Sequence, residues 1–302
     1  MQLPKALKKG DTIAITCPSG YIDKAVVLEA KQQLEAWGFK VLVGATVAKS
    51  DNYFSAPDEL RLKDLQKYLD DPGVAAILMG RGGYGMSRII DGLDFSAFAR
   101  QPKWICGFSD ITVIHNHIQR NYGVATLHGP MCSSFTKENA KKDFLKAYKQ
   151  ILTGKPVHYS APANKYNVPG KACGILVGGN LAMLAHLSGS SSAMNAHGKI
   201  LFIEDIGEHL YNIDRMLYNL KRAGAFDQLL AVVCGGFTDL EDTTRPFGQD
   251  IYQILNHHFG TLGIPLAFDM PSGHIDENWP LCLGGRYEVE VKKQGTTLHF
   301  LY

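Results

Sequence analysis

The sequence predicts an α/β protein of two domains, the first built on a parallel sheet with helices on both faces. Three observations lead to this prediction. The chain has 302 residues, enough for one large domain or two of about 150 residues each. Short apolar runs alternate with amphipathic segments through the first half, as in parallel sheets connected by helices. A proline-containing stretch of little periodicity follows, from 154 to 170.

We therefore divide the chain into an N-terminal α/β domain at 1–153, a linker at 154–171 and a C-terminal domain at 172–302. In the first domain, Val27, Ala30 and Leu34 recur at helical spacing before Gly38, which is a suitable C-terminal cap. The expected strands are 12–16, 41–47, 74–79, 104–107 and 124–127, and the expected helices are 23–37, 58–69, 86–93, 111–122 and 139–152. Ligands of such a sheet bind at the carboxyl ends of its strands.

The second half contains further strands and helices and ends in two alternating runs that are typical of an antiparallel pair. The expected strands are 172–177, 199–204, 232–237, 266–269, 287–291 and 297–301, and the expected helices are 181–187, 210–223 and 249–259. No internal repeat accompanies them.

Composition argues against several classes of protein. The 31 Lys and Arg nearly balance the 29 Asp and Glu, so no basic surface for nucleic acid is expected. The N-terminus lacks the apolar stretch of a secretory signal, and no run is long enough to span a membrane, which predicts a cytoplasmic protein. The six cysteines form no C-x-x-C pair, which favours buried reduced thiols over disulfides or a structural zinc site.

A glycine-rich stretch, GRGGYG from Gly80 to Gly85, follows a predicted strand and precedes a predicted helix. Its spacing fits a dinucleotide-binding turn. Against that interpretation, it follows the third strand rather than the first, Arg81 is bulky, and no carboxylate ends the next strand. Two alternatives are a tight turn that simply requires glycine, and an active-site loop that donates backbone N–H groups.

Ser109 lies at the next junction of strand and helix, where a nucleophile elbow would hold its hydroxyl clear of the sheet. The G-x-S-x-G pattern is only partly matched, because Ile111 replaces the second glycine, and a serine here could instead cap a helix. The N–H of Asp110 and an N–H of the Gly82-Gly83 turn could together hold an oxyanion, which favours the nucleophile.

A serine nucleophile needs a base and a carboxylate that orients it. His274 is the first candidate for the base, because it lies in a loop after a predicted strand, where catalytic groups collect. His128 is the second, by the same argument. Glu204 ends an apolar strand and is the candidate carboxylate, with the adjacent Asp205 as its rival.

Several of these segments together resemble the LD-carboxypeptidases, also called muramoyltetrapeptide carboxypeptidases, which are cytoplasmic serine peptidases of cell-wall recycling. The resemblance runs in order through almost the whole chain, and so is more specific than any one motif. The matching segments are GRGGYG at 80–85, GFSD at 107–110, HGPM at 128–131, GGNL at 178–181, IED at 203–205 with DRML at 214–217, and Gly273-His274 with NWPL at 278–281.

The resemblance implies a triad of Ser109 as nucleophile, His274 as base and Glu204 as the orienting carboxylate. It also implies a Rossmann- or flavodoxin-like N-terminal domain and a smaller β-rich C-terminal domain, with the active site at their interface. The implied substrate is a muropeptide tetrapeptide that loses its terminal D-alanine, with Arg81 a candidate for gripping the free carboxylate. No cofactor or metal is implied, and a homodimer is.

Two alternatives stay open. The microcin C immunity proteins form a sister branch of the family that uses the same triad on a peptide-nucleotide toxin. A protein of a different class, a nucleotide-binding oxidoreductase or binding module, could be built on the glycine turn.

Overall fold

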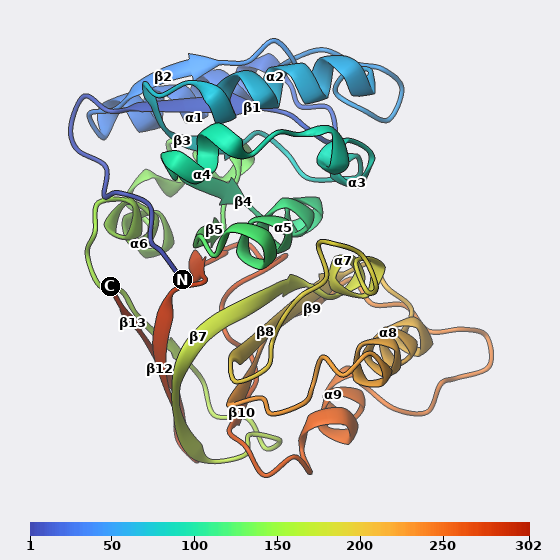
Figure 1. Cartoon of the computed structure of the whole chain (residues 1–302). Helices are drawn as coiled ribbons and strands as arrows, with labels where there is room; N and C mark the ends of the chain where they lie inside the picture. Colours follow the sequence, from blue (N-terminus) through green and yellow to red (C-terminus); the bar gives the residue numbers. More distant parts are fainter.

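The computed structural model describes residues 1–302 and contains two sheets, with the first above the second in Figure 1. The first has six strands in the order β11-β5-β4-β3-β1-β2, of which only β11 is antiparallel to its neighbour. The order 2-1-3-4-5 is that of flavodoxin-like folds, which bind ligands at the carboxyl ends of the strands. The strands are β1 (Thr12–Thr16), β2 (Lys40–Val43), β3 (Val74–Met79), β4 (Trp104–Gly107), β5 (Thr126–His128) and β11 (Leu281–Leu283).

Helices cover both faces of this sheet because its strands are apolar on both sides. Ile13 and Ile15 pack in the same core as α1 and α6, whereas Ala14 packs with α2, α3 and α5. This alternation follows from the two-residue period of a strand. The helices are α1 (Lys24–Ala36), α2 (Asp58–Asp70), α3 (Met86–Ile89), α4 (Ser96–Arg100), α5 (Thr112–Tyr122) and α6 (Asp143–Leu152), with short 3-10 turns η1 (Ile90–Gly92), η2 (Ser109–Ile111), η3 (Cys132–Ser134) and η4 (Asn139–Lys141).

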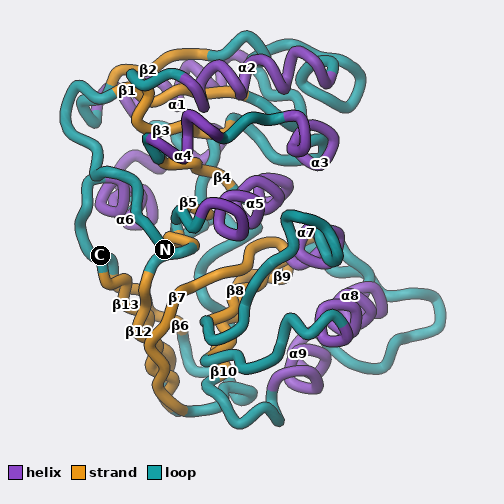
Figure 2. Tube along the Cα trace, in the orientation of Figure 1, coloured by secondary structure: helices purple, strands orange, loops and turns teal.

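The second sheet has seven strands in the order β10-β9-β8-β7-β12-β13-β6. Strands β7 to β10 are parallel, and the remaining strands pair antiparallel. Figure 2 shows the helices α8 and α9 beside the parallel part of this sheet. The elements are β6 (His158–Ala161), β7 (Gly170–Asn180), α7 (Leu181–His186), β8 (Ile200–Ile206), α8 (Leu210–Arg222), β9 (Ala231–Thr238), α9 (Ile251–Phe259), β10 (Leu266–Ala267), β12 (Arg286–Lys292) and β13 (Gly295–Leu301).

Two short strands are absent from the sequence prediction. β6 lies inside residues 154–171, where we expected a linker, and β11 returns from the second half of the chain to pair with β5 of the first sheet. Both have only three or four residues, too few for a clear two-residue period. The expected helix at 86–93 is also shorter, because the chain changes from α3 to a 3-10 turn at Ile90.

The two sheets and their helices share apolar packing, and polar contacts between α5 and β7 position the site. A single core cluster runs from β1 and α1 to β12 and β13. At the carboxyl end of β7, the Asn180 N–H donates to the Thr112 hydroxyl, 3.1 Å away, at the start of α5. Gly179 lies so close that an added β-carbon would be 2.7 Å from Thr112 Oγ1. No helix of the structure has both the length and the apolar character that crossing a bilayer requires.

Candidate active site

Ser109 occupies a strained turn between β4 and α5. Its φ is +65°, a left-handed conformation that residues other than glycine seldom adopt. The turn is placed at the carboxyl end of the buried strand β4, and Gly107 before it has φ +158°. A strained backbone conformation costs free energy and persists only where the surrounding structure enforces it. Such residues are concentrated at functional sites. The sharp turn leaves the Ser109 side chain partly exposed rather than within the sheet.

The glycine turn after β3 lies directly against Ser109. A β-carbon added at Gly82 would be 2.9 Å from Ser109 Cβ and 3.1 Å from its Oγ. The carbonyl oxygen of Gly82 accepts a 2.9 Å hydrogen bond from the N–H of Gly20, in the loop after β1. Glycine at this position therefore lets the backbone approach the serine hydroxyl. Gly83 is exposed beside it with φ +99°.

The side chain of Asp110 anchors this region. Its Oδ2 accepts hydrogen bonds from the Ser19 hydroxyl at 2.5 Å and from the Met86 N–H at 2.8 Å. These bonds join the loops after β1, β3 and β4. Burial raises the pKa of Asp110, partly offset by the bond from Ser19. The backbone N–H of Asp110 has no acceptor within the chain, so it is free to donate elsewhere.

Glu204 and His274 form a hydrogen-bonded pair in the second domain. The Nδ1 atom of His274 lies 2.6 Å from Glu204 Oε2, and the backbone N–H of His274 donates to the same oxygen over 3.1 Å. Glu204 is fully buried near the end of β8, and the side chain of His274 is 14% exposed. A carboxylate on Nδ1 leaves Nε2 of the imidazole as the atom directed to other partners.

The loop that carries His274 approaches Glu204 closely because it contains Gly273. A β-carbon there would be 2.7 Å from Glu204 Oε2, and the φ of +111° also favours glycine. The buried side chain of Asn278 accepts a 2.9 Å hydrogen bond from the Gly273 N–H. The Thr238 hydroxyl, at the end of β9, donates to the carbonyl oxygen of His274 over 2.9 Å. The loop is thus held on both sides of the imidazole.

Electrostatics favour the charged form of His274. Burial lowers its pKa, but the hydrogen bond to Glu204 and the charges of Glu204 and Asp205 more than offset this, so the pKa lies above its usual value. An imidazole stabilised in this way is a stronger base.

The two rival residues have other surroundings. Asp205 accepts hydrogen bonds from Asn180 Nδ2 at 2.8 Å and from the Ala182 N–H at 2.9 Å, not from His274. Burial, followed by the charge of Glu204, raises the pKa of Asp205 to about 7. His128 is fully buried between Phe108 and Phe202, and neither nitrogen of its ring has a hydrogen-bond partner. Burial lowers its pKa well below the usual value.

The serine region and the Glu204–His274 pair meet at the contact between the sheets. The ring of Phe108, the residue before Ser109, lies 4.7 Å from the imidazole of His274 between centroids. Thr112, three residues after Ser109, contacts Gly179, and the neighbouring Asn180 pairs with Glu204 in the sheet. Phe108 therefore touches His274 itself, whereas Thr112 touches β7, the strand that pairs with the Glu204 strand β8.

Arg81 lies on the exposed rim beside this region. Its guanidinium donates to the carbonyl oxygen of Tyr21 over 3.2 Å and has no acidic partner. Tyr53 and Tyr84 are also exposed here, at 62% and 43%, and the Tyr53 hydroxyl lies against Gly83. Together they form a rim of one cation and two aromatic rings next to the glycine turn.

Several residues that shape the site carry no signal of that role in the sequence. Arg61 is fully buried and donates to the carbonyl oxygens of Ala56 and Gly85, which ties the loops around the glycine turn together. Nothing in its helical sequence distinguishes it from a surface arginine. Tyr53 lies in the loop between the expected strand at 41–47 and the expected helix at 58–69. Only its proximity to Gly83 in the structure makes it part of the rim of the site.

The geometry suits acyl transfer. A hydroxyl in a strained turn, an imidazole bonded to a buried carboxylate, and free backbone N–H groups beside a glycine wall are the parts that such chemistry needs. His115 and His117 have separate partners, the Gly107 carbonyl oxygen and the Ser192 hydroxyl. No cluster of three or more potential metal ligands occurs in the chain.

Comparisons with known proteins give one family in both halves of the chain. The LD-carboxypeptidase N-terminal domain matches residues 13–129, and the LD-carboxypeptidase C-terminal domain matches residues 173–289. A probable murein peptide carboxypeptidase of Bacillus subtilis (strain 168) is 35% identical over 294 residues, which cover 96% of this chain and 92% of the relative.

Two crystal structures share the fold over nearly the whole chain. Muramoyltetrapeptide carboxypeptidase from Oxalobacter formigenes has a TM-score of 0.84 and 29% identity, covering 96% of this chain and 98% of its own. An MccF-like protein from Bacillus anthracis strain Ames has a TM-score of 0.85 and 27% identity, covering 100% of this chain and 99% of its own.

Proposed function

This chain belongs to the LD-carboxypeptidase family of peptidases, and on that premise we propose that it is a serine-type LD-carboxypeptidase with the triad Ser109, His274 and Glu204. It releases the terminal D-alanine of a muropeptide tetrapeptide in the cytoplasmic recycling of peptidoglycan. The observation that carries the proposal is the 2.6 Å hydrogen bond between Glu204 and His274, because it supplies a buried, oriented base next to the turn that holds the serine.

In this mechanism Ser109 is the nucleophile. Glu204 holds the Nδ1–H of His274, so Nε2 accepts the proton of the Ser109 hydroxyl as the oxygen attacks the carbonyl carbon before D-alanine. The imidazolium then gives that proton to the leaving amine, and the C–N bond breaks. A water molecule repeats the sequence on the acyl-enzyme and frees the tripeptide.

The developing oxyanion is held by backbone N–H groups. The free N–H of Asp110 follows the nucleophile directly, and Gly82 and Gly83 supply the wall on the opposite side. Donors fixed in the backbone need no reorganisation as charge develops, which is why they lower the barrier. The hydrogen bonds from Ser19 and Met86 to the Asp110 side chain fix this peptide unit.

A carboxypeptidase must also bind the free carboxylate of its substrate. We assign that role to Arg81, because its guanidinium is on the rim beside Gly82 and forms no ion pair within the chain.

The reaction requires no cofactor or metal, since the triad and the backbone donors supply the base, the nucleophile and the charge stabilisation. We also propose that the protein acts as a homodimer. Light scattering of the purified protein, which measures its mass in solution, tests this.

The central experiment is incubation of the purified protein with a muropeptide tetrapeptide, followed by mass spectrometry. Loss of a single alanine is expected, whereas an unchanged tetrapeptide would contradict the proposal. A processed microcin analogue in a parallel incubation tests the second candidate, an MccF-type peptidase, which the TM-score of 0.85 to the MccF-like protein keeps in consideration. Cleavage of the analogue alone would favour that candidate.

A further inference from the structure

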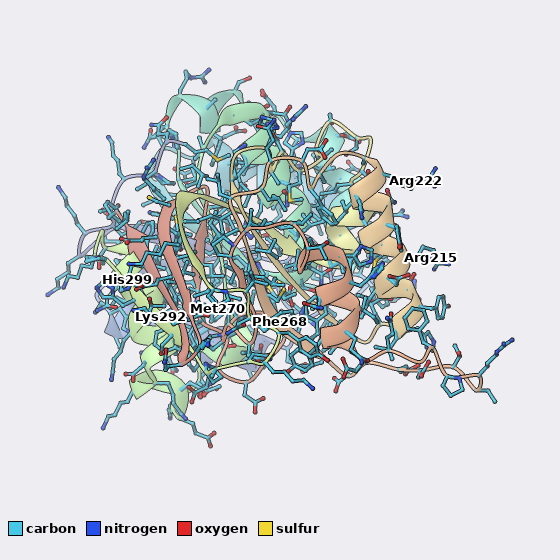
Figure 3. All side chains as sticks on the ribbon, turned by 90° about the horizontal axis from the view of Figure 1, so that it is seen from below. Arg215, Arg222, Phe268, Met270, Lys292 and His299 are labelled. Atoms are coloured by element: carbon cyan, nitrogen blue, oxygen red, sulfur yellow. The ribbon has the colours of Figure 1, made fainter.

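Two buried histidines lie behind the serine turn and take no part in the mechanism described above. His115 is on α5 and His128 is at the end of β5, and both side chains are fully buried. Other histidines lie nearer the surface, such as the partly exposed His299 of β13, which Figure 3 shows on the opposite side of the view from Arg215 and Arg222 of α8. A buried imidazole gives up its hydration, and hydrogen bonds or packing must offset that cost.

His115 contacts the backbone just before the nucleophile. Its Nε2 atom lies 2.8 Å from the carbonyl oxygen of Gly107, the last residue of β4. The same oxygen accepts a 3.1 Å hydrogen bond from the N–H of Gly129. Because a carbonyl oxygen only accepts, Nε2 carries the proton of the neutral ring. This bond therefore joins α5 to the strand that ends two residues before Ser109.

The surroundings of His115 keep this donor neutral. Burial lowers the pKa of His115 to about 4, partly offset by the hydrogen bond to Gly107. Its Nδ1 atom is buried without a partner, so a proton there would place a charge in an apolar site. Burial, followed by the charge of His115, lowers the pKa of the neighbouring His128 well below its usual value. Both rings are therefore uncharged at neutral pH, and the Nε2–H of His115 remains a donor.

The backbone from Gly107 to Ser109 requires a restraint of this kind. Gly107 has φ +158° and Ser109 has φ +65°. Glycine rotates to other conformations at little steric cost, and rotation of the peptide between Gly107 and Phe108 would redirect the Ser109 side chain. A strained residue keeps its conformation only where its surroundings enforce it. The hydrogen bond from His115 to the Gly107 carbonyl oxygen opposes that rotation.

The same stretch of α5 also contacts the second sheet. The Nδ2 atom of Asn116 donates to a carbonyl oxygen of β7 over 3.3 Å, and the Thr112 hydroxyl accepts from the Asn180 N–H. Asn180 pairs with Glu204 in the sheet. Thr112, His115 and Asn116 are all buried. One stretch of helix therefore contacts the strand before the nucleophile and the strand beside the orienting carboxylate.

From these contacts we infer that His115 is a positioning residue, which fixes the Ser109 turn relative to the pair of Glu204 and His274 without touching the substrate. This inference rests on the proposed function, in which Ser109 is the nucleophile. The function requires a hydrogen-bond donor at the position of Nε2, not only the volume of the ring. Loss of the donor should lower kcat and leave KM unchanged, because the groups that bind the peptide keep their places.

The experiment compares His115→Gln with His115→Met, two side chains of similar length. Glutamine places an amide nitrogen near the position of Nε2 and can donate to Gly107, whereas methionine has no donor. His115→Gln should retain a kcat close to that of the wild type. For His115→Met we expect kcat to fall by about ten- to a hundredfold, the cost of a misplacement of up to about 1 Å in a catalytic group. KM should be unchanged in both variants.

A role in packing alone predicts the opposite order of the two variants. Methionine leaves no unpaired polar atom in the space of the His115 ring, whereas the amide oxygen of glutamine would lack a donor there. His115→Met should therefore melt at or above the temperature of His115→Gln, although it is the slower enzyme. The control on the same helix is His117→Met, which removes a bond to the Ser192 hydroxyl. It should lose stability but keep the kcat of the wild type.

Equal kcat values for His115→Gln and His115→Met, or a higher value for His115→Met, would overturn the inference. Crystal structures of the two variants provide a readout without turnover. The backbone from Gly107 to Ser109 should be unchanged in His115→Gln and displaced in His115→Met. If the wild type cleaves no tetrapeptide, the proposed function fails, whereas an identical serine turn in both variants would reject the role of His115 separately.

Discussion

The imidazole of His274 and the carboxylate of Glu204 share a hydrogen bond of 2.6 Å, although 70 positions separate them in the chain. The Glu204→Gln substitution keeps the shape of the side chain but removes its charge. We expect kcat to fall by about ten thousandfold, as when the orienting carboxylate of a triad is replaced by its amide. Steady-state kinetics on the tetrapeptide measure the change.

Asp205→Asn is the matched control for this substitution, because Asp205 is the neighbouring buried carboxylate and bonds to Asn180 and Ala182. Its activity should stay within about tenfold of the wild type, since its partners belong to the start of α7 and not to the imidazole. If Asp205→Asn proves the more damaging of the two, the assignment of Glu204 as the orienting carboxylate is wrong.

Ser109→Ala should abolish turnover while the fold remains intact. The expected loss in kcat is about a millionfold, as for other removed triad nucleophiles. The control is Ser191→Ala, which changes an exposed serine distant from Ser109 in the sequence. This variant should be as active as the wild type. Circular dichroism checks that both variants are folded, and near wild-type turnover by a folded Ser109→Ala protein would refute the mechanism.

The pH profile should report the raised pKa of His274. A general base must be neutral, so kcat/KM should fall as the pH drops through this pKa, which lies above the usual value of about 6.5. Glu204→Gln removes the partner that raises the pKa and leaves burial, which lowers it, so residual activity should persist to lower pH. An unmoved acid limb in that variant would mean that another group titrates.

The same pKa shift has a consequence for stability. Because the folded-state pKa of His274 exceeds the unfolded value, its contribution to stability is fully present below about pH 6.5. The contribution is lost as the pH rises through the folded-state pKa. Denaturant unfolding of the wild type and of His274→Gln at several pH values should show their difference shrinking across this window.

Gly273→Ala should damage the site by steric contact. The added β-carbon would lie 2.7 Å from Glu204 Oε2, so either the loop or the carboxylate must move. A misplacement of about 1 Å in a catalytic group costs about a hundredfold in rate. Gly263→Ala is the matched control, because Gly263 also has a positive φ, +70°, but open space around it. Equal activities of the two variants would contradict the steric argument.

The exposed rim should contribute to substrate binding rather than to chemistry. For Tyr53→Ala we expect KM to rise several-fold with little change in kcat, because the ring is beside Gly83 and does not touch the reacting residues. Stability should change by no more than about 0.5 kcal/mol, as is usual for exposed positions. Tyr211→Ala, an exposed tyrosine on α8, should leave both kinetic constants unchanged.

Much of the fold follows from local sequence. The strands at 12–16, 74–79 and 104–107 were predicted to the residue, because both faces of each are buried and their apolar runs end abruptly at polar or glycine residues. The family and the order of its motifs are also present in the sequence and need no coordinates. β6 and β11 could not be predicted, because each is stabilised by a distant partner strand rather than by its own pattern.

Local sequence determined the candidates for the site, and the tertiary structure decided how they pair. Glu204 and Asp205 are adjacent acids at the end of one apolar strand, and the family resemblance, rather than the local pattern, favours Glu204. Successive side chains of a strand point to opposite faces, so only one of the two reaches the loop of His274, while the other meets α7. Which carboxylate faces the imidazole depends on where α7 and the His274 loop pack, and that is fixed by contacts between segments far apart in the chain.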